Sequence, residues 1–165
     1  MGRVIREVTG DRRAYMPLLL IADEQEDMVE RYIALGTMYV MEEDGRAVGE
    51  CLLTDEGGGV CEIKNIAVAP ECRGRGYGRE MIEFALARCA GKYGALQVGT
   101  GDSPLTVPFY EKCGFKRHHV VPDFFTDNYD HPIVECGVLL RDMVYLRRDV
   151  PRDLADGEGK DGEKA

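Results

Sequence analysis

The sequence predicts a mixed α/β fold in which one sheet with interspersed helices forms a single domain over residues 1–150. Short alternating or apolar runs of the kind found in strands dominate the chain. Between them lie segments whose apolar residues recur at helical spacing. The third observation is size, because 165 residues can enclose a proper core without disulfides or a bound metal.

The first half of the chain begins with a strand and continues with helices. Residues 3–8 alternate as a short strand does, and apolar residues from 11 to 36 fall on helical faces before a closing glycine. Apolar runs on both sides of Asp44-Gly45 then predict a β-hairpin. The run VCEIKNIAVAP predicts a buried strand, which its proline ends because proline has no N–H for the ladder.

The second half again mixes helices and strands. Apolar residues at helical spacing predict a helix that starts between Arg75 and Tyr77. A short helix in FYEKCGF should begin near Thr106 as its N-cap, because Pro108 deeper in a helix would lose a hydrogen bond. The predicted strands are ALQVGTG at 95–101, KRHHVV at 116–121 and DMVYLRRDV at 142–150, with an irregular stretch at 122–140.

The composition argues against several classes of partner. A net charge of −9 and a pI near 4.9 repel phosphate backbones and anionic membranes, so neither a nucleic acid nor a membrane is expected to bind. A secretory segment and a long apolar run are both absent from the sequence, which favours a cytoplasmic protein. Residues 151–165 have almost nothing to bury and are expected to form a disordered acidic tail.

The cysteines are spread along the chain without a CxxC pair, and most fall within apolar patterns. They are therefore interpreted as reduced core residues, and no metal site is expected because the ligand spacings are absent. The six are Cys51, Cys61, Cys72, Cys89, Cys113 and Cys136.

The most informative stretch is APECRGRGYGREMIEFAL, residues 69–86, which concentrates glycine and arginine at 73–79. Glycines let the backbone turn tightly and bring N–H groups close to a ligand. The helix that follows points its free N–H groups and the positive end of its dipole at the same place. Arg73, Arg75 and Arg79 add side-chain charge, so the stretch predicts an anion site for phosphate. A glycine-rich surface turn with solvated arginines is the alternative.

Two familiar phosphate motifs do not fit this stretch. A dinucleotide fingerprint that begins at Gly74 requires glycine where Arg79 stands. A P-loop requires Gly-Lys-Ser/Thr at its end, which is absent here. The phosphate site therefore belongs to another class.

Residues 73–78, Arg-Gly-Arg-Gly-Tyr-Gly, match at every fixed position the acetyl-CoA signature Arg/Gln-x-x-Gly-x-Gly/Ala, and the sequence resembles the GNAT superfamily of N-acetyltransferases. IKNIAVAPEC resembles the family's central strand, and FYEKCGF resembles its second signature. The detailed match covers residues 61–116. The resemblance implies a GNAT-like acyl-CoA N-acyltransferase fold with a central, mostly antiparallel sheet flanked by helices. It also implies acetyl transfer from acetyl-CoA to a primary amine by direct attack in a ternary complex.

The resemblance assigns cofactor-binding residues to two segments and one loop. Backbone groups of the central strand would pair with the pantetheine arm, and the Val68 amide would face the thioester carbonyl. Amides of residues 73–78 would hold the pyrophosphate. Asp102 stands where many members have an asparagine, and it can accept a hydrogen bond but cannot donate one. The full set is Ile66, Ala67, Val68, Arg73, Gly74, Arg75, Gly76, Tyr77, Gly78 and Asp102.

Two catalytic residues follow from the same resemblance. Tyr110 lies where the family places a hydroxyl that protonates the departing thiolate, and the alternative is a core tyrosine. Glu62 lies where the histone-acetylating branch carries its catalytic glutamate. Other branches deprotonate the amine through ordered water, so Glu62 as the base and Glu62 as a polar strand residue both stay open.

The acceptor is the least defined part of the prediction. PDFFTDNYDHPIVE combines aromatic rings with carboxylates, which suits a cationic amine and assigns substrate binding to Phe124 and Tyr129. A packed loop with solvated acids is the alternative. The expected partner is a small-molecule or peptide amine, and the family commonly forms homodimers. A non-catalytic acyl-CoA-binding sensor and a nucleotide-binding protein are the competing functions.

Overall fold

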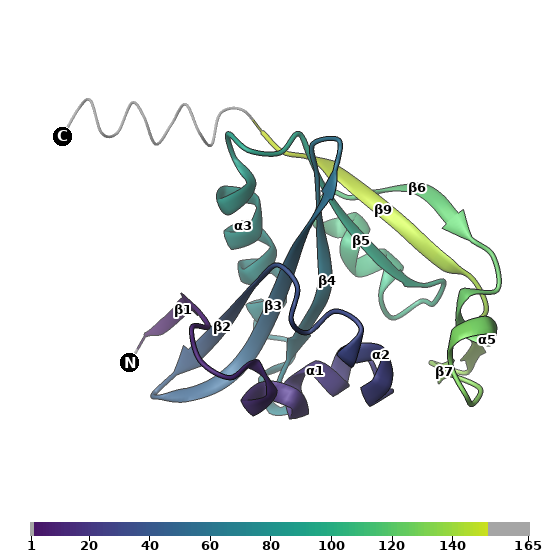
Figure 1. Cartoon of the computed structure of the whole chain (residues 1–165), viewed down its shortest axis with the longest axis horizontal. Helices are drawn as coiled ribbons and strands as arrows, with labels where there is room; N and C mark the ends of the chain where they lie inside the picture. The colour runs from purple at the N-terminus through teal and green to yellow at the C-terminus, as the bar shows by residue number, and fades with distance from the viewer. Residues whose placement is uncertain (1, 152–165) are drawn as a thin grey trace.

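A seven-stranded sheet runs through the computed structural model, which describes residues 2–151 (Figure 1). The predicted tail at 151–165 therefore lies outside the described residues except for its first member. The strand order is β1-β2-β3-β4-β5-β9-β6. The strands are β1 (Arg3–Glu7), β2 (Thr37–Glu43), β3 (Arg46–Gly57), β4 (Val60–Val68), β5 (Ala95–Gly101), β6 (Lys116–Val121) and β9 (Met143–Asp149).

The sheet is mixed and mostly antiparallel, which confirms the predicted fold class. Every neighbouring pair in it is antiparallel except β4 and β5, which run parallel. A parallel pair needs a crossover, and the helix α3 (Tyr77–Cys89) supplies it. The predicted strands and the Asp44-Gly45 hairpin are confirmed.

Helices cover both faces of the sheet, and the strands alternate accordingly. On β2, Met38 and Val40 pack in a core with residues of α1 and α2, whereas Tyr39 and Met41 pack in a core with α3. This period of two is the pattern of a strand buried on both faces. Figure 1 shows α1 and α2 together along one side of the strands and α3 on another. The helices before the crossover are η1 (Arg12–Tyr15), α1 (Met16–Ala22) and α2 (Glu26–Glu30).

The strands β4 and β5 diverge toward their carboxyl ends (Figure 1). They pair only from Val60–Ile63 to Ala95–Val98. Beyond that point β4 stays on β3 as far as Val68, and β5 stays on β9 as far as Gly101. The divergence leaves one edge of β4 without a neighbouring strand at the middle of the sheet, and the helix α4 (Val107–Lys112) follows the end of β5.

The stretch at 122–140, expected to be irregular, contains short regular elements. A helix α5 (Phe124–Asn128) is followed by a hairpin of β7 (Val134–Glu135) and β8 (Val138–Leu139). A small core of Phe125, Ile133 and Leu140 holds the segment together. Each element is too short for periodicity to reveal it in the sequence.

Five cysteines are buried as predicted, but Cys136 is exposed. It lies in the turn of the β7–β8 hairpin with a positive φ of 51°, so it is not the core residue that the sequence suggested. Within residues 2–151 no group of three His, Cys, Asp or Glu side chains is arranged to hold a metal ion. None of the helices in that range has the length and apolar character required to span a membrane.

Candidate active site

A cavity of about 440 Å³ opens where β4 and β5 diverge. Its walls come from both strands, from α4, from the α1–α2 connection and from the 122–140 segment. The volume lies in the range of small-molecule binding sites. The residues that line the cavity come from segments that are far apart in the sequence.

The free edge of β4 turns backbone donors toward this cavity. The Ala69 N–H donates to the Val48 carbonyl at 2.8 Å, on the β3 side of the strand. Successive N–H groups along a strand point to opposite edges, so the N–H groups of Val68 and Ile66 point to the edge that β5 has left. Ile66, Ala67 and Val68 all line the cavity. This edge can pair with an extended ligand as a further strand would.

The Gly/Arg turn, residues 73–78, forms an anion site at the start of α3. Gly74 and Gly76 adopt left-handed conformations with φ of 79° and 82°, which glycine reaches without steric cost. A Cβ at either position would meet no atom within 4 Å, so the space over the turn is open. Among the described residues, the amides of 76–79 have no hydrogen-bond acceptor, and the helical ladder begins with Glu80 N–H to Gly76 O at 3.0 Å. Free amides and the helix dipole together favour an anion here.

The side chains of the turn have different roles. Arg73 is exposed and lines the cavity. Tyr77 is buried, donates to Glu43 at 2.6 Å and lies under the Arg3 guanidinium, so its ring anchors the helix. A Cβ at Gly78 would lie 3.2 Å from Phe109 Cζ, which shows how closely α3 approaches α4. Tyr77 and Gly78 can therefore serve a ligand through their amides alone.

Tyr110 lies on α4 and lines the cavity. Most of its surface is buried, and only 7% of it is exposed. Its ring packs edge-to-face against Phe109 and Phe115, with centroids 5.2 and 5.8 Å away. Burial raises the pKa of the Tyr110 hydroxyl above its ordinary value, so the proton stays bound at neutral pH. No hydrogen bond joins this hydroxyl to another residue in the described range, which leaves its proton available to a ligand.

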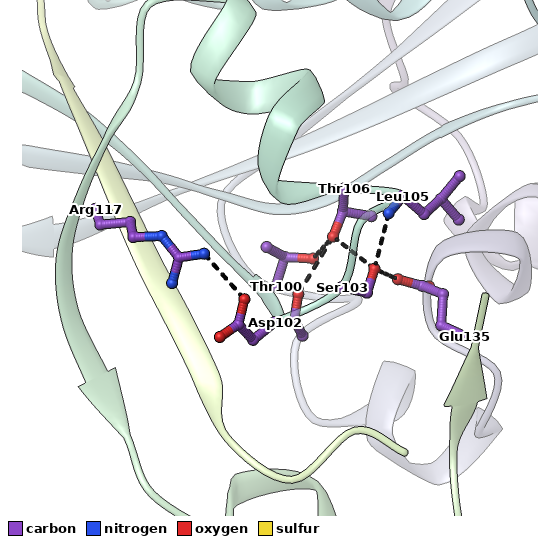
Figure 2. A network of polar contacts seen from close by, with 8 residues as sticks. Thr100, Asp102, Ser103, Leu105, Thr106, Arg117 and Glu135 are labelled. Atoms are coloured by element: carbon purple, nitrogen blue, oxygen red, sulfur yellow. Dashed lines mark hydrogen bonds and ion pairs between the residues drawn. The ribbon is translucent and has the colours of Figure 1, made fainter. Parts of the chain in front are cut away.

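Hydrogen bonds fix the start of α4 relative to the end of β5 (Figure 2). The Thr100 hydroxyl donates to Thr106 Oγ1 at 2.8 Å, and Thr106 bonds to the Gly101 carbonyl at 3.3 Å. Thr106 is the N-cap residue as predicted, yet its hydroxyl makes no capping bond to the helix. Ser103 donates to Glu135 of β7, so the 122–140 segment is tied to the same corner.

Glu62 does not line the cavity with Tyr110. It is buried on β4, and its two oxygens are taken by Gln97 Nε2 at 2.6 Å and Lys64 Nζ at 3.1 Å. Lys64 does line the cavity, so Glu62 is separated from the cavity by the Lys64 side chain that it contacts. A direct role as base would require one of these contacts to break.

The remaining predicted residues are divided between the cavity and the surface. Asp102 is exposed and pairs with Arg117 at 3.0 Å, directed away from the Ser103–Glu135 contact in Figure 2. Tyr129 lines the cavity, whereas Phe124 packs beside the small core of its segment. Its neighbour Phe125 supplies the cavity-lining ring of α5.

Sequence reasoning missed Asp23 and Asn65, which both line the cavity. Asp23 accepts hydrogen bonds from Tyr129 at 2.6 Å and Tyr32 at 2.9 Å. Asn65 donates from Nδ2 to Tyr32 Oη and to the Leu19 carbonyl. No local pattern marks Asp23, because one of its partners is 106 positions away in the sequence. Asn65 lies inside the central-strand match, which could have directed attention to it.

Comparisons with known proteins agree on one family. A family model described as acetyltransferase (GNAT) domain matches residues 34–117. The Bacillus subtilis protein YvbK, named an uncharacterized N-acetyltransferase, is 35% identical over 136 residues, which cover 81% of this chain and 87% of YvbK.

Two solved structures share the fold and carry the ligand in their names. A GNAT family acetyltransferase from Elizabethkingia anophelis with acetyl-CoA bound has a TM-score of 0.84 at 30% identity, covering 89% of this chain and 97% of its own. A Bacillus subtilis acetyltransferase in complex with CoA has a TM-score of 0.84 at 30% identity, covering 91% of this chain and 100% of its own.

Proposed function

Because this chain belongs to the GNAT acetyltransferase family and is an acetyl-CoA-dependent N-acetyltransferase, we propose that it acetylates a primary amine by direct attack in a ternary complex. One observation carries the proposal. The free edge of β4, Arg73 of the Gly/Arg turn and Tyr110 all line the same cavity. A single cavity that contains both a site for the acetyl donor and a group that can donate a proton suits two substrates that bind at the same time. The acceptor is a small-molecule or peptide amine.

Acetyl-CoA fits the donors that the chain presents. The unpaired amides of the Gly/Arg turn and the positive charge of Arg73 suit a pyrophosphate. The unpaired edge of β4 at Ile66 and Val68 suits the amides of a pantetheine arm. Asp102 pairs with Arg117 on the surface, so it contributes to this site only if that contact opens.

The transfer itself needs a donor for the carbonyl oxygen and a proton for the leaving group. Acetyl-CoA, when bound, supplies a thioester that an amine can attack. The Val68 N–H would donate to the carbonyl oxygen as negative charge develops there, and one such donor is typically worth about 3 kcal/mol. Tyr110 would give its proton to the departing thiolate, since its raised pKa keeps that proton in place until the sulfur leaves.

Two groups are candidates for the base that removes the proton from the amine. One is Glu62, which would act through a water molecule, and the other is ordered water that acts without Glu62. If Glu62 takes part, Glu62→Gln should lower kcat tenfold or more with little change in the KM for acetyl-CoA, because the amine stays protonated. Steady-state rates from pH 6 to 9 check this. Glu56→Gln is the matched control, because Glu56 also contacts Lys64 Nζ, at 3.7 Å. An unchanged Glu62→Gln rate at every pH would remove Glu62 from the mechanism.

The test of the function is the release of free CoA thiol from acetyl-CoA. We expect release only when an amine is added, and a panel of small amines and peptides would find the acceptor. Binding of CoA without release for any amine would favour the non-catalytic sensor. Thermal stabilisation by ATP as strong as that by CoA would favour the nucleotide-binding alternative.

The wider setting of the protein follows the same reasoning. We propose one domain over residues 1–150, because a chain of this length can enclose a single core. We propose a cytoplasmic location, which suits the free, mostly buried cysteines. We propose no nucleic-acid or membrane partner, because the chain is acidic overall. The homodimer that is common in the family stays a prediction, which sedimentation of the purified protein would test.

A further inference from the structure

We propose that the acceptor is a diamine or polyamine whose second ammonium group is anchored by Asp23. This inference rests on the proposed function, since it names the class of amine that the same cavity takes. It is carried by the contacts of Asp23, by an unpaired oxygen of Asn65 and by the distribution of charge along the cavity.

The Asp23 carboxylate is held in a fixed position on the cavity wall. Its Oδ1 accepts from the Tyr129 hydroxyl at 2.6 Å, and its Oδ2 accepts from the Tyr32 hydroxyl at 2.9 Å. The Asp130 N–H donates to Gln25 Oε1 at 3.0 Å and joins the same two segments beside it. The α1–α2 connection and the 122–140 segment therefore meet at Asp23, which makes its orientation independent of any ligand.

Asp23 is largely buried but has no cation beside it among the described residues. Its recorded partners are hydroxyls, the Gln25 backbone and the like charge of Asp27. A buried carboxylate without a counter-charge is costly, and burial raises the pKa of Asp23 above its ordinary value. An ammonium group in the cavity would supply the missing charge and an additional hydrogen-bond donor.

Asn65 is a second and independent indication of a ligand that donates hydrogen bonds. It lines the cavity, is 4% exposed and uses both protons of Nδ2 on Leu19 O and Tyr32 Oη. Its Oδ1 is buried without a hydrogen-bond partner. Buried polar atoms are rarely left unpaired. A ligand N–H group that reaches this oxygen would satisfy it.

The charges of the cavity are segregated. Arg73 lies on the side of the Gly/Arg turn, and the ammonium group of Lys64 is occupied by Glu62 and Glu56. The α1–α2 and 122–140 walls contribute only carboxylates as charged groups: Asp23, Glu24 and Glu135. The Phe125 and Tyr129 rings lie on the same side and offer faces to a cation. Glu135 accepts from Ser103, and Glu24 lies 3.9 Å from His131 Nε2. A monoamine would therefore leave Asp23 as the carboxylate without a counter-charge.

The experiment compares two acceptors of equal length that differ in one ammonium group, 1,4-diaminobutane and n-butylamine. With the wild-type protein we expect kcat/KM at least tenfold higher for the diamine. Asp23→Asn should remove most of that preference through a higher KM for the diamine, while KM for n-butylamine stays the same. Glu26→Gln is the matched control, since Glu26 is an exposed carboxylate on α2 outside the cavity lining.

A second variant and a binding measurement test the role of Asp23 without relying on the Asp23→Asn variant alone. Asp23→Glu keeps the charge but moves the carboxylate by one methylene, so it should lower the diamine preference and serves as the second variant if Asp23→Asn proves unstable. Calorimetric binding of both amines to the protein with CoA requires no turnover. Equal binding and equal kcat/KM for the two amines would overturn the diamine proposal and leave acetyl transfer intact. Tighter binding of the diamine with no thiol release would support Asp23 as the anchor and overturn the proposed function.

Discussion

Tyr110→Phe should lower kcat about a hundredfold or more while the affinity for acetyl-CoA stays unchanged. The phenylalanine ring keeps the packing against Phe109 and Phe115. No hydrogen bond within residues 2–151 is lost with the hydroxyl, so stability should change little. What disappears is the proton for the leaving thiolate, and a positioned general acid typically contributes about 10²- to 10⁴-fold.

Thiol release in the steady state measures kcat, and calorimetry with CoA measures binding. Tyr93→Phe is the matched control, since it removes a hydroxyl from a tyrosine outside the cavity lining. The pH profile adds a second check. Because burial raises the pKa of Tyr110, its proton should still be bound at pH 9, and the wild-type rate should not fall there on its account. A Tyr110→Phe variant with full kcat would rule out the acid role.

Gly76→Ala should weaken CoA binding about tenfold. Gly76 precedes α3 with a φ of 82°, a conformation that costs a non-glycine residue about 1–2 kcal/mol. Relief of that strain would rotate the unpaired amides away from their common direction. A loss of about 1.4 kcal/mol corresponds to a tenfold change in the dissociation constant. The methyl group itself meets no protein atom within 4 Å, so the effect comes from the backbone and from the space left for the ligand.

Gly45→Ala provides the matched control for this substitution. Gly45 has a φ of 78° in the turn between β2 and β3, and a Cβ there also meets no atom within 4 Å. Both variants should lose a similar amount of unfolding free energy in urea. Only Gly76→Ala should change the dissociation constant for CoA in calorimetry. Equal CoA binding by the two variants would show that the Gly/Arg turn does not hold the ligand.

Much of the fold could be predicted from short-range patterns. The strand at 60–68, the hairpin at Asp44-Gly45 and the late start of α4 near Pro108 are confirmed. Each depends on neighbouring residues, through alternation, turn chemistry or the missing N–H of proline. The elements α5, β7 and β8 were not predicted, because two to five residues are too few to establish a period.

The sequence by itself determined the Gly/Arg turn, the strand before it, the helix after it and the family. These features are contiguous, and their backbone conformations follow from glycine, proline and apolar spacing. Only the tertiary structure decided that Glu62 lies behind Lys64, that Asp102 faces Arg117 and that Asp23 meets Tyr129. The reason is that the divergence of β4 from β5 and the packing of the 122–140 segment depend on contacts between distant residues. No local pattern encodes which side chains those contacts bring to one cavity.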